Sequence, residues 1–195
     1  MSSILHAAPV LLVFGDSLSA GYGVPQGQGW VALLEKQLAG RYQVVNASIS
    51  GETTAGGLAR LDQALHRHRP AIVLLELGAN DGLRGLPLQL AEQNLAQMLD
   101  KLKQAKARPL LIGMQLPPNY GQRYVREFDA MYSRLAQQRQ IALVPFLMEG
   151  FAERREYFQA DGIHPTAAAQ AQILVNINRQ LQPLLRDKGT EKSGK

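Results

Sequence analysis

Apolar runs of strand length alternate with segments of helical period along almost the whole chain. Runs such as VLLVFG and AIVLLELG are apolar at nearly every position, which is typical of strands that helices cover on both faces. Their alternation with helices predicts a single-domain, doubly wound α/β fold around a parallel sheet of about five strands. The expected strands span Val10–Gly15, Gln43–Ile49, Ala71–Gly78, Pro109–Leu116 and Ala142–Phe146.

The segments between these strands have the period of amphipathic helices. The last helix is expected to begin at Ala167, with Thr166 as its N-cap and Pro183 at its end. Residues 1–185 then form one domain. Residues 186–195 are polar and without periodicity, so we expect a disordered tail. The other expected helices span residues 27–40, 54–68, 87–106 and 121–139.

Composition and charge exclude several classes of protein. The 195 residues carry a net charge of +5 that is spread thinly, whereas nucleic-acid binding needs a concentrated basic stripe, so no nucleic-acid partner is expected. The longest apolar run, Ala7–Phe14, has eight residues, well short of the roughly 18 that a membrane span needs. The absence of cysteine excludes disulfides, thiolate zinc sites and iron–sulfur clusters.

Polar residues follow three of the expected strands. In an open α/β sheet, ligands bind outside the carboxyl ends of the strands, so these residues are candidates for chemistry. The first strand runs into Ser17, the second into the turn that holds Gly51, and the third into Asn80. Asp161 and His164 come shortly before the last helix. Together they supply a hydroxyl, two candidate oxyanion donors, an imidazole and a carboxylate.

This set of side chains fits nucleophilic catalysis by a serine. A serine hydroxyl attacks well only when a base takes its proton, and a histidine serves best when a carboxylate fixes its tautomer. Asp161 and His164 are three residues apart, which lets the carboxylate reach Nδ1 while Nε2 points outward, and Ser17 would complete a triad. The N–H of Gly51 and the amide of Asn80 suit an oxyanion. The G-x-S-x-G elbow of α/β-hydrolases is absent, because a serine replaces its second glycine.

Four ordered motifs resemble those of the GDSL or SGNH hydrolases, named for blocks that contribute Ser, Gly, Asn and His. They are GDSL, ASISG, GAND and DGIHP. The longer strings around them, such as GDSLSAGYGV and LELGANDGLRGLP, are similar to a bacterial subgroup of thioesterases, lysophospholipases and arylesterases. The resemblance covers about residues 10–185. A lone GDSL is a weak signal, whereas four ordered blocks are a strong one.

The resemblance implies a flavodoxin-like, three-layer α/β/α sandwich and assigns a role to each motif. Ser17 would be the nucleophile, His164 the general base and acid, and Asp161 the residue that orients it. The oxyanion hole would consist of the backbone N–H groups of Ser17 and Gly51 and the side chain of Asn80. No metal or organic cofactor is implied.

The activity implied is hydrolysis of carboxylic esters and thioesters through an acyl-serine intermediate, with a small acyl ester as substrate. Two alternatives remain: a carbohydrate O-deacetylase, and a catalytically silent module that binds lipid or sugar. Apolar residues after the fourth and fifth strands are candidates for an acyl groove. These candidate substrate-binding residues are Leu116, Pro117, Tyr120, Phe146 and Met148.

Two acidic residues beside these motifs have simpler interpretations. Glu76 is a charged residue inside an apolar strand, and we expect it to pair with a basic neighbour. Asp16 is expected to be a hydrogen-bond acceptor that fixes its loop.

The compartment depends on how the chain begins. The subgroup it resembles is commonly exported behind a signal peptide, but Met1–Pro9 has no basic region followed by an apolar one. We expect a periplasmic or secreted protein if a signal peptide has been removed, and a cytoplasmic one if Met1 is the native start.

Overall fold

The computed structural model describes residues 7–186. It contains one parallel sheet with the strand order β2-β1-β3-β4-β5, and the prediction of a five-stranded α/β fold is confirmed. The first strand of the chain, β1, lies inside the sheet, with β2 on one side and β3 on the other, as in doubly wound flavodoxin-like folds. The strands are β1 (Val10–Gly15), β2 (Gln43–Asn46), β3 (Ile72–Glu76), β4 (Arg108–Ile112) and β5 (Ala142–Val144).

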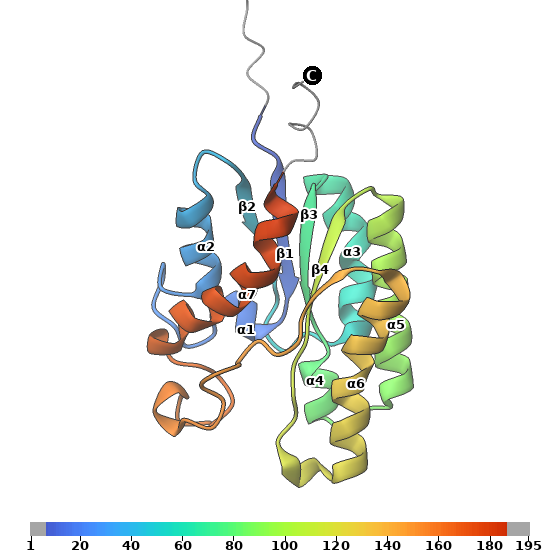
Figure 1. Cartoon of the computed structure of the whole chain (residues 1–195), viewed down its shortest axis with the longest axis vertical. Helices are drawn as coiled ribbons and strands as arrows, with labels where there is room; N and C mark the ends of the chain where they lie inside the picture. Colours follow the sequence, from blue (N-terminus) through green and yellow to red (C-terminus); the bar gives the residue numbers. More distant parts are fainter. Residues whose placement is uncertain (1–6, 187–195) are drawn as a thin grey trace, which may run out of the picture.

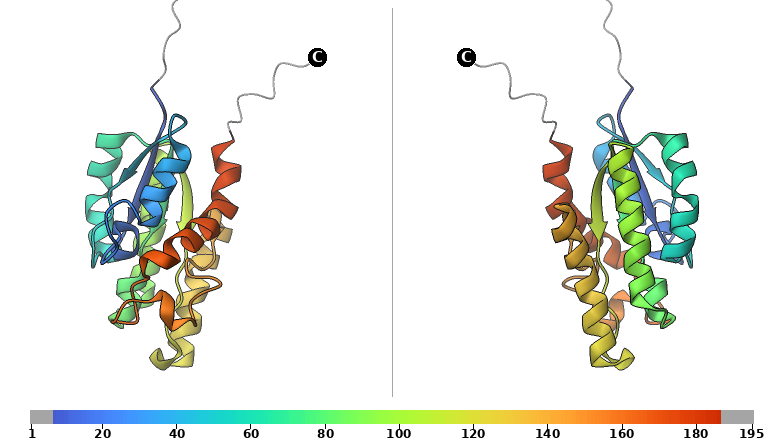
Figure 2. Two further views of the ribbon diagram at one scale, coloured as in Figure 1. Left: turned by 90° about the vertical axis from the view of Figure 1, so that its left-hand side faces the viewer. Right: turned by 90° about the vertical axis from the view of Figure 1, so that its right-hand side faces the viewer.

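Helices cover the sheet on both faces (Figures 1 and 2). The pair α2 and α7 packs on one face, and α3, α5 and α6 pack on the other. Two further helices, α1 and α4, are short and follow β1 and β3 directly. The helices are α1 (Ser17–Ala20), α2 (Trp30–Leu38), α3 (Thr54–His68), α4 (Ala79–Leu83), α5 (Leu88–Gln104), α6 (Gln122–Arg139) and α7 (Gln170–Leu185).

Burial explains why these segments take these conformations. Every residue of β3 is buried, which accounts for its unbroken apolar run under two helical layers. Helix α5 instead buries one stripe at a spacing of three and four residues, from Leu88 through Ala91, Leu95 and Leu102, as an amphipathic helix does. Within residues 7–186, no helix is both long and apolar enough to cross a membrane.

The structure corrects several expectations about element ends. Strands β3, β4 and β5 end at Glu76, Ile112 and Val144 rather than at Gly78, Leu116 and Phe146. Strand β2 ends at Asn46 rather than Ile49, although the N–H groups of Ala47 and Ile49 still donate to carbonyls of β1. Thr166 precedes a short 3₁₀ turn, and its hydroxyl donates to the Tyr157 carbonyl instead of capping a helix. Pro183 lies inside α7, in a last turn where little of the helix remains to be disrupted. The expected tail, apart from Arg186, lies outside the described residues.

The carboxyl ends of the strands meet at one edge of the molecule, and this edge positions the candidate residues. Helix α1 begins at Ser17 directly after β1, and Asn80 lies in α4 after β3. The connection from β5 to α7 crosses the same edge (Figure 1) and carries Asp161 and His164. The topology thus brings together residues that are 147 positions apart in the chain.

Candidate active site

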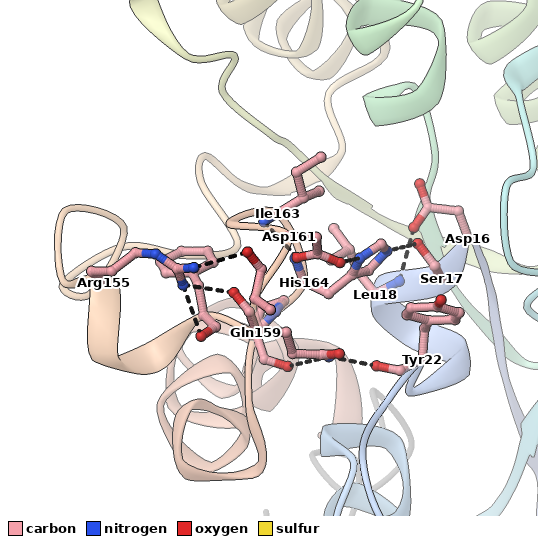
Figure 3. A network of polar contacts seen from close by, with 12 residues as sticks. Asp16, Ser17, Leu18, Tyr22, Arg155, Gln159, Asp161, Ile163 and His164 are labelled. Carbon is pink, nitrogen blue, oxygen red and sulfur yellow. Dashed lines mark hydrogen bonds and ion pairs between the residues drawn. The ribbon is translucent and has the colours of Figure 1, made fainter.

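Ser17, His164 and Asp161 form one continuous chain of hydrogen bonds (Figure 3). The Nε2 atom of His164 lies 2.9 Å from Ser17 Oγ, and its Nδ1 atom lies 2.7 Å from Asp161 Oδ2. Both are ordinary hydrogen-bond distances. The three side chains that the sequence placed in one triad therefore converge in the structure.

The Asp161 carboxylate also shapes the loop that carries the histidine. Its Oδ1 atom accepts the backbone N–H groups of Ile163 at 2.9 Å and His164 at 3.0 Å. These bonds, the one from Ile163 foremost and then the contact with the imidazole, lower the pKa of Asp161 to about 2. The group is therefore a carboxylate at neutral pH, able to hold a proton on Nδ1 of the ring and leave Nε2 as an acceptor.

The turn that carries Ser17 is buried and capped. Asp16 is the N-cap of α1, and its Oδ1 atom accepts the N–H of Leu18 at 3.0 Å, so it fixes its loop as expected. The single tryptophan, Trp30, donates its indole N–H to the Leu18 carbonyl from α2. Ser17 itself is 9% exposed, which leaves its hydroxyl at the surface of an otherwise buried turn.

Glu76 lies beneath this turn, fully buried at the end of β3. Its Oε2 atom accepts the N–H of Asp16 at 3.2 Å and the hydroxyl of Ser19 at 2.7 Å. A Cβ at Gly15 would lie 2.6 Å from the same oxygen, so the carboxyl group fits only because that residue is glycine. The prediction of a basic partner for Glu76 is wrong: its neighbours are an amide, a hydroxyl and a second carboxyl group.

The two buried carboxyl groups shift each other's protonation. Burial raises the pKa of Asp16 to about 6. Burial, followed by the nearby negative charge of Asp16, raises the pKa of Glu76 well above its usual range. The pair accordingly retains a proton under conditions in which an exposed pair would have none.

The two other predicted oxyanion donors lie beside this turn. The Nδ2 atom of Asn80 donates to Asp16 Oδ2 and to the Glu52 carbonyl, both at 3.0 Å. Gly51 precedes Glu52 in the chain, and its carbonyl accepts a bond from Arg84 at 2.9 Å. The motifs that hold Ser17, Gly51 and Asn80 are therefore joined by direct hydrogen bonds.

A groove of about 730 Å³ opens beside the loop that carries Asp161 and His164. Three of the predicted substrate-binding residues line it: Leu116, Pro117 and Phe146. The other two lie elsewhere, since Met148 is buried in the core and Tyr120 donates its hydroxyl to the Leu83 carbonyl outside the groove. Large apolar side chains that also line it are Phe151, Phe158 and Ile163, and the polar or charged residues of its lining are Gln115, Glu149, Glu153 and Arg154.

Ile163 is a residue that the sequence interpretation missed. It lies between Asp161 and His164 in the chain, lines the groove and is 44% exposed. A large apolar side chain inside the polar motif DGIHP was the available signal, because such a residue on a surface loop has no core to enter.

Across the part of the chain that the structure describes, no cluster of three His or acidic side chains could hold a metal ion.

Comparison with known proteins adds an independent line of evidence. Residues 13–172 match the family model described as GDSL-like lipase/acylhydrolase. The chain is 53% identical to the esterase TesA of Pseudomonas aeruginosa, covering 92% of this chain and 90% of that one. It is 49% identical to thioesterase 1/protease 1/lysophospholipase L1 of Escherichia coli, covering 92% and 86%. A crystal structure of TesA superimposes with a TM-score of 0.87 at 53% identity, covering 90% and 99%.

Proposed function

The chain belongs to the GDSL-like lipase/acylhydrolase family and hydrolyses carboxylic esters and thioesters, and from this premise we propose that Ser17, His164 and Asp161 are its catalytic residues. The observation that carries the proposal is the unbroken hydrogen-bond chain from the hydroxyl to the carboxylate. It is the arrangement that activates a serine in other hydrolases.

In the proposed reaction, Ser17 Oγ attacks the acyl carbonyl as His164 Nε2 takes its proton. The Asp161 carboxylate holds the resulting imidazolium in place. When the tetrahedral intermediate collapses, the bond to the alcohol or thiol breaks and His164 protonates the leaving group. Water then attacks the acyl-serine with His164 again as base, which releases the carboxylic acid and restores the hydroxyl.

The oxyanion formed in each step would be stabilised by the N–H groups of Ser17 and Gly51 and by the amide of Asn80. Both hydrogens of Asn80 Nδ2 already have acceptors, on Asp16 and on the Glu52 carbonyl. Donation to the oxyanion therefore requires Asn80 to exchange or share its bond with Asp16. The protonation of the buried pair Asp16 and Glu76 should therefore affect how easily Asn80 donates to the oxyanion.

The groove supports an acyl group longer than acetate as the part of the substrate that it holds. Its lining includes several apolar side chains, and Gly162 and Ile163 bring it next to His164 in the chain. The apolar side chains favour an acyl chain over a sugar in this groove, although its lining also includes Gln115, Glu149, Glu153 and Arg154. Matched esters and thioesters with acyl chains of two to sixteen carbons test this point: activity should rise beyond two carbons, and a profile confined to acetate would favour the deacetylase.

Covalent labelling tests the triad directly. A fluorophosphonate probe should label the wild type at Ser17, and Ser17→Ala should abolish labelling and lower kcat by about 10³- to 10⁶-fold. Ser133→Ala, which changes an exposed serine on α6, is the matched control and should behave as wild type. Full activity in Ser17→Ala would overturn the assignment, and an unlabelled, inactive wild type would favour a silent binding module.

A further inference from the structure

The acid–base loop has little regular structure to hold it. It runs from a 3₁₀ turn at Arg155–Tyr157 to another at Ala167–Ala169. The side chain of Asp161 is 38% exposed and that of His164 is 20% exposed. Packing holds the base of the loop, where Tyr157 and Phe158 lie against the core and Phe158 pairs with the buried Pro165. The exposed tip that carries Asp161 depends more on specific hydrogen bonds.

One residue of this loop, Gln159, hydrogen-bonds both to the backbone at His164 and Pro165 and to the segment after Ser17. Its backbone N–H donates to the His164 carbonyl at 2.8 Å. Its side-chain Nε2 donates to the Pro165 carbonyl at 3.1 Å and to the Tyr22 carbonyl at 2.8 Å (Figure 3). Gln159 thus links the acid–base loop to the segment that follows Ser17.

These bonds close a ring around the two reacting side chains. The N–H of Tyr22 donates to the Ser17 carbonyl at 3.1 Å, and the Tyr22 ring lies against the imidazole with 4.6 Å between ring centroids. The path runs from Ser17 through Tyr22 and Gln159 to His164, and returns to Ser17 through the 2.9 Å contact of Nε2 with Oγ. We expect a change at Gln159 or Tyr22 to alter that contact.

The surroundings of Gln159 restrict where its side chain can go. Arg155 donates to three successive carbonyls, those of Phe158 at 3.0 Å, Gln159 at 2.6 Å and Ala160 at 3.0 Å, so the backbone at Gln159 is fixed. On the opposite side, Gly23 has a φ of 69°, and a Cβ there would collide with the Gln159 amide. The amide has room to reach the Tyr22 carbonyl because this neighbour is glycine.

We propose that Gln159 is a positioning residue for ester hydrolysis. It sets the distance between His164 and Ser17 by joining the acid–base loop to the turn that carries Ser17, called here the nucleophile turn. The inference rests on the proposed triad. A neutral hydrogen bond at the surface contributes little to global stability, whereas a displacement of about 1 Å in a catalytic group can lower the rate about 100-fold. Loss of the tie should therefore affect turnover far more than folding.

The first test replaces Gln159 by methionine, which has similar volume and no N–H donor. We expect Gln159→Met to lower kcat by about 10- to 100-fold, while KM changes by less than about threefold because the groove residues are untouched. The rate of fluorophosphonate labelling should fall by the same factor as kcat. The matched control is Gln37→Ala, which removes a reciprocal pair of bonds between Gln37 and Asn178 on α2 and α7 and should leave kcat unchanged.

A double-mutant cycle tests the contact of Gln159 with the Tyr22 segment by a substitution at Gly23. Gly23→Ala should displace the Gln159 side chain and lower kcat about tenfold in the wild-type background. In the Gln159→Ala background no amide is present to displace, so the same change should lower kcat by less than about threefold. Backbone strain at position 23 would instead act equally in both backgrounds.

The possible outcomes separate this inference from the triad itself. Wild-type kcat and labelling in Gln159→Met would overturn the positioning role, and so would a fall in both that thermal unfolding of the variant fully accounts for. Equal effects of Gly23→Ala in both backgrounds would also overturn it. If Ser17→Ala is inactive while Gln159→Met is fully active, only the positioning role fails; if Ser17→Ala is active, the triad fails.

Discussion

Ser17 and His164 lie within hydrogen-bond distance, yet the regions that supply them are built in opposite ways. The nucleophile turn follows the fully buried end of β1 and rests on the buried carboxyl group of Glu76. The acid–base loop crosses the surface between two 3₁₀ turns and depends on hydrogen bonds made by Asp161 and Gln159. Packing fixes the first region, whereas the second depends more on polar contacts of half-buried and exposed side chains.

The carboxyl groups of the two regions also differ, because their pKa values are shifted in opposite directions. Burial raises the pKa of Asp16 to about 6 in the nucleophile turn, whereas hydrogen bonds lower the pKa of Asp161 to about 2 in the acid–base loop. The enzyme thus holds one carboxyl pair that resists ionisation beside a carboxylate that resists protonation. The two halves of the proposed triad should therefore respond differently to substitution, to pH and to denaturant.

Removing the charge from the acid–base loop should have the largest effect. In Asp161→Asn the amide nitrogen cannot accept a proton from Nδ1, so the imidazole proton moves to Nε2 and blocks the transfer from Ser17. We expect kcat to fall by about 10³- to 10⁴-fold with little loss of stability, because the remaining oxygen can still accept the N–H of Ile163. Ester hydrolysis and urea unfolding measure the two quantities.

The control for this prediction is Asp62→Asn, which removes a carboxylate that pairs with Lys101 on the surface and should change kcat by less than twofold. A fall in activity of Asp161→Asn that is matched by a collapse of the folded state would mean that Asp161 stabilises the loop rather than the reaction.

The nucleophile turn should respond in the opposite sense, through stability. Glu76→Ala leaves the Asp16 N–H and the Ser19 hydroxyl without their acceptor and opens a cavity, so we expect the free energy of unfolding to fall by about 2–4 kcal/mol. Glu76→Gln keeps an oxygen for both donors and should cost less than about 1 kcal/mol. Urea denaturation measures both; equal losses in the two variants would show that the hydrogen bonds to Oε2 are unimportant.

The pH dependence of stability should separate the two carboxyl groups. Between pH 3.8 and about 6 the folded protein keeps a proton on Asp16 that the unfolded chain releases, so this group makes stability fall as pH rises. Between about pH 2 and 3.8 the unfolded chain holds a proton that folded Asp161 lacks, so this group makes stability fall as pH drops.

Unfolding free energies of the wild type, Asp16→Asn and Asp161→Asn between pH 2 and 7 test these signs. Asp16→Asn should make the decline above pH 4 shallower, with Glu76, whose pKa burial also raises, contributing the remainder. Asp161→Asn should make the decline below pH 4 shallower. The opposite assignment of slopes to variants would contradict the contrast between the two regions.

The smallest effect concerns the order in which the regions unfold. Trp30 is fully buried and its indole bonds the Leu18 carbonyl, so its fluorescence reports on the nucleophile turn, whereas activity requires both regions. Exposed loops open at lower free energy than buried strands. Activity should therefore be lost at a urea concentration a few tenths molar below the midpoint of the Trp30 transition, and coincident midpoints would show that the loop unfolds only with the core.

The contrast also explains what the sequence could predict. Strands β1 and β3 can be recognised from the sequence, because both faces of the sheet are buried there and the strands are apolar at nearly every position. The bounds of β1 are as predicted. The motif residues Ser17, Asp161 and His164 could be grouped because their chemistry requires one another. These parts of the structure depend on local pattern or on chemical necessity.

Other parts depend on where distant segments meet in space. No periodicity signals that an amide at Gln159 reaches the Tyr22 carbonyl, because the contact exists only after two loops have been placed. The charge of Glu76 was visible in its apolar strand, but its partners belong to the turn after β1 rather than to a basic side chain. The groove lining was also predicted only in part, since Met148 was expected in the groove but is buried in the core.

The separation of Ser17 and His164 by 147 positions has a consequence for biosynthesis. A nascent chain that ends before Asp161 contains Ser17 and all five strands, but neither the base nor the acid of the proposed triad. We therefore expect such a ribosome-bound chain to lack esterase activity.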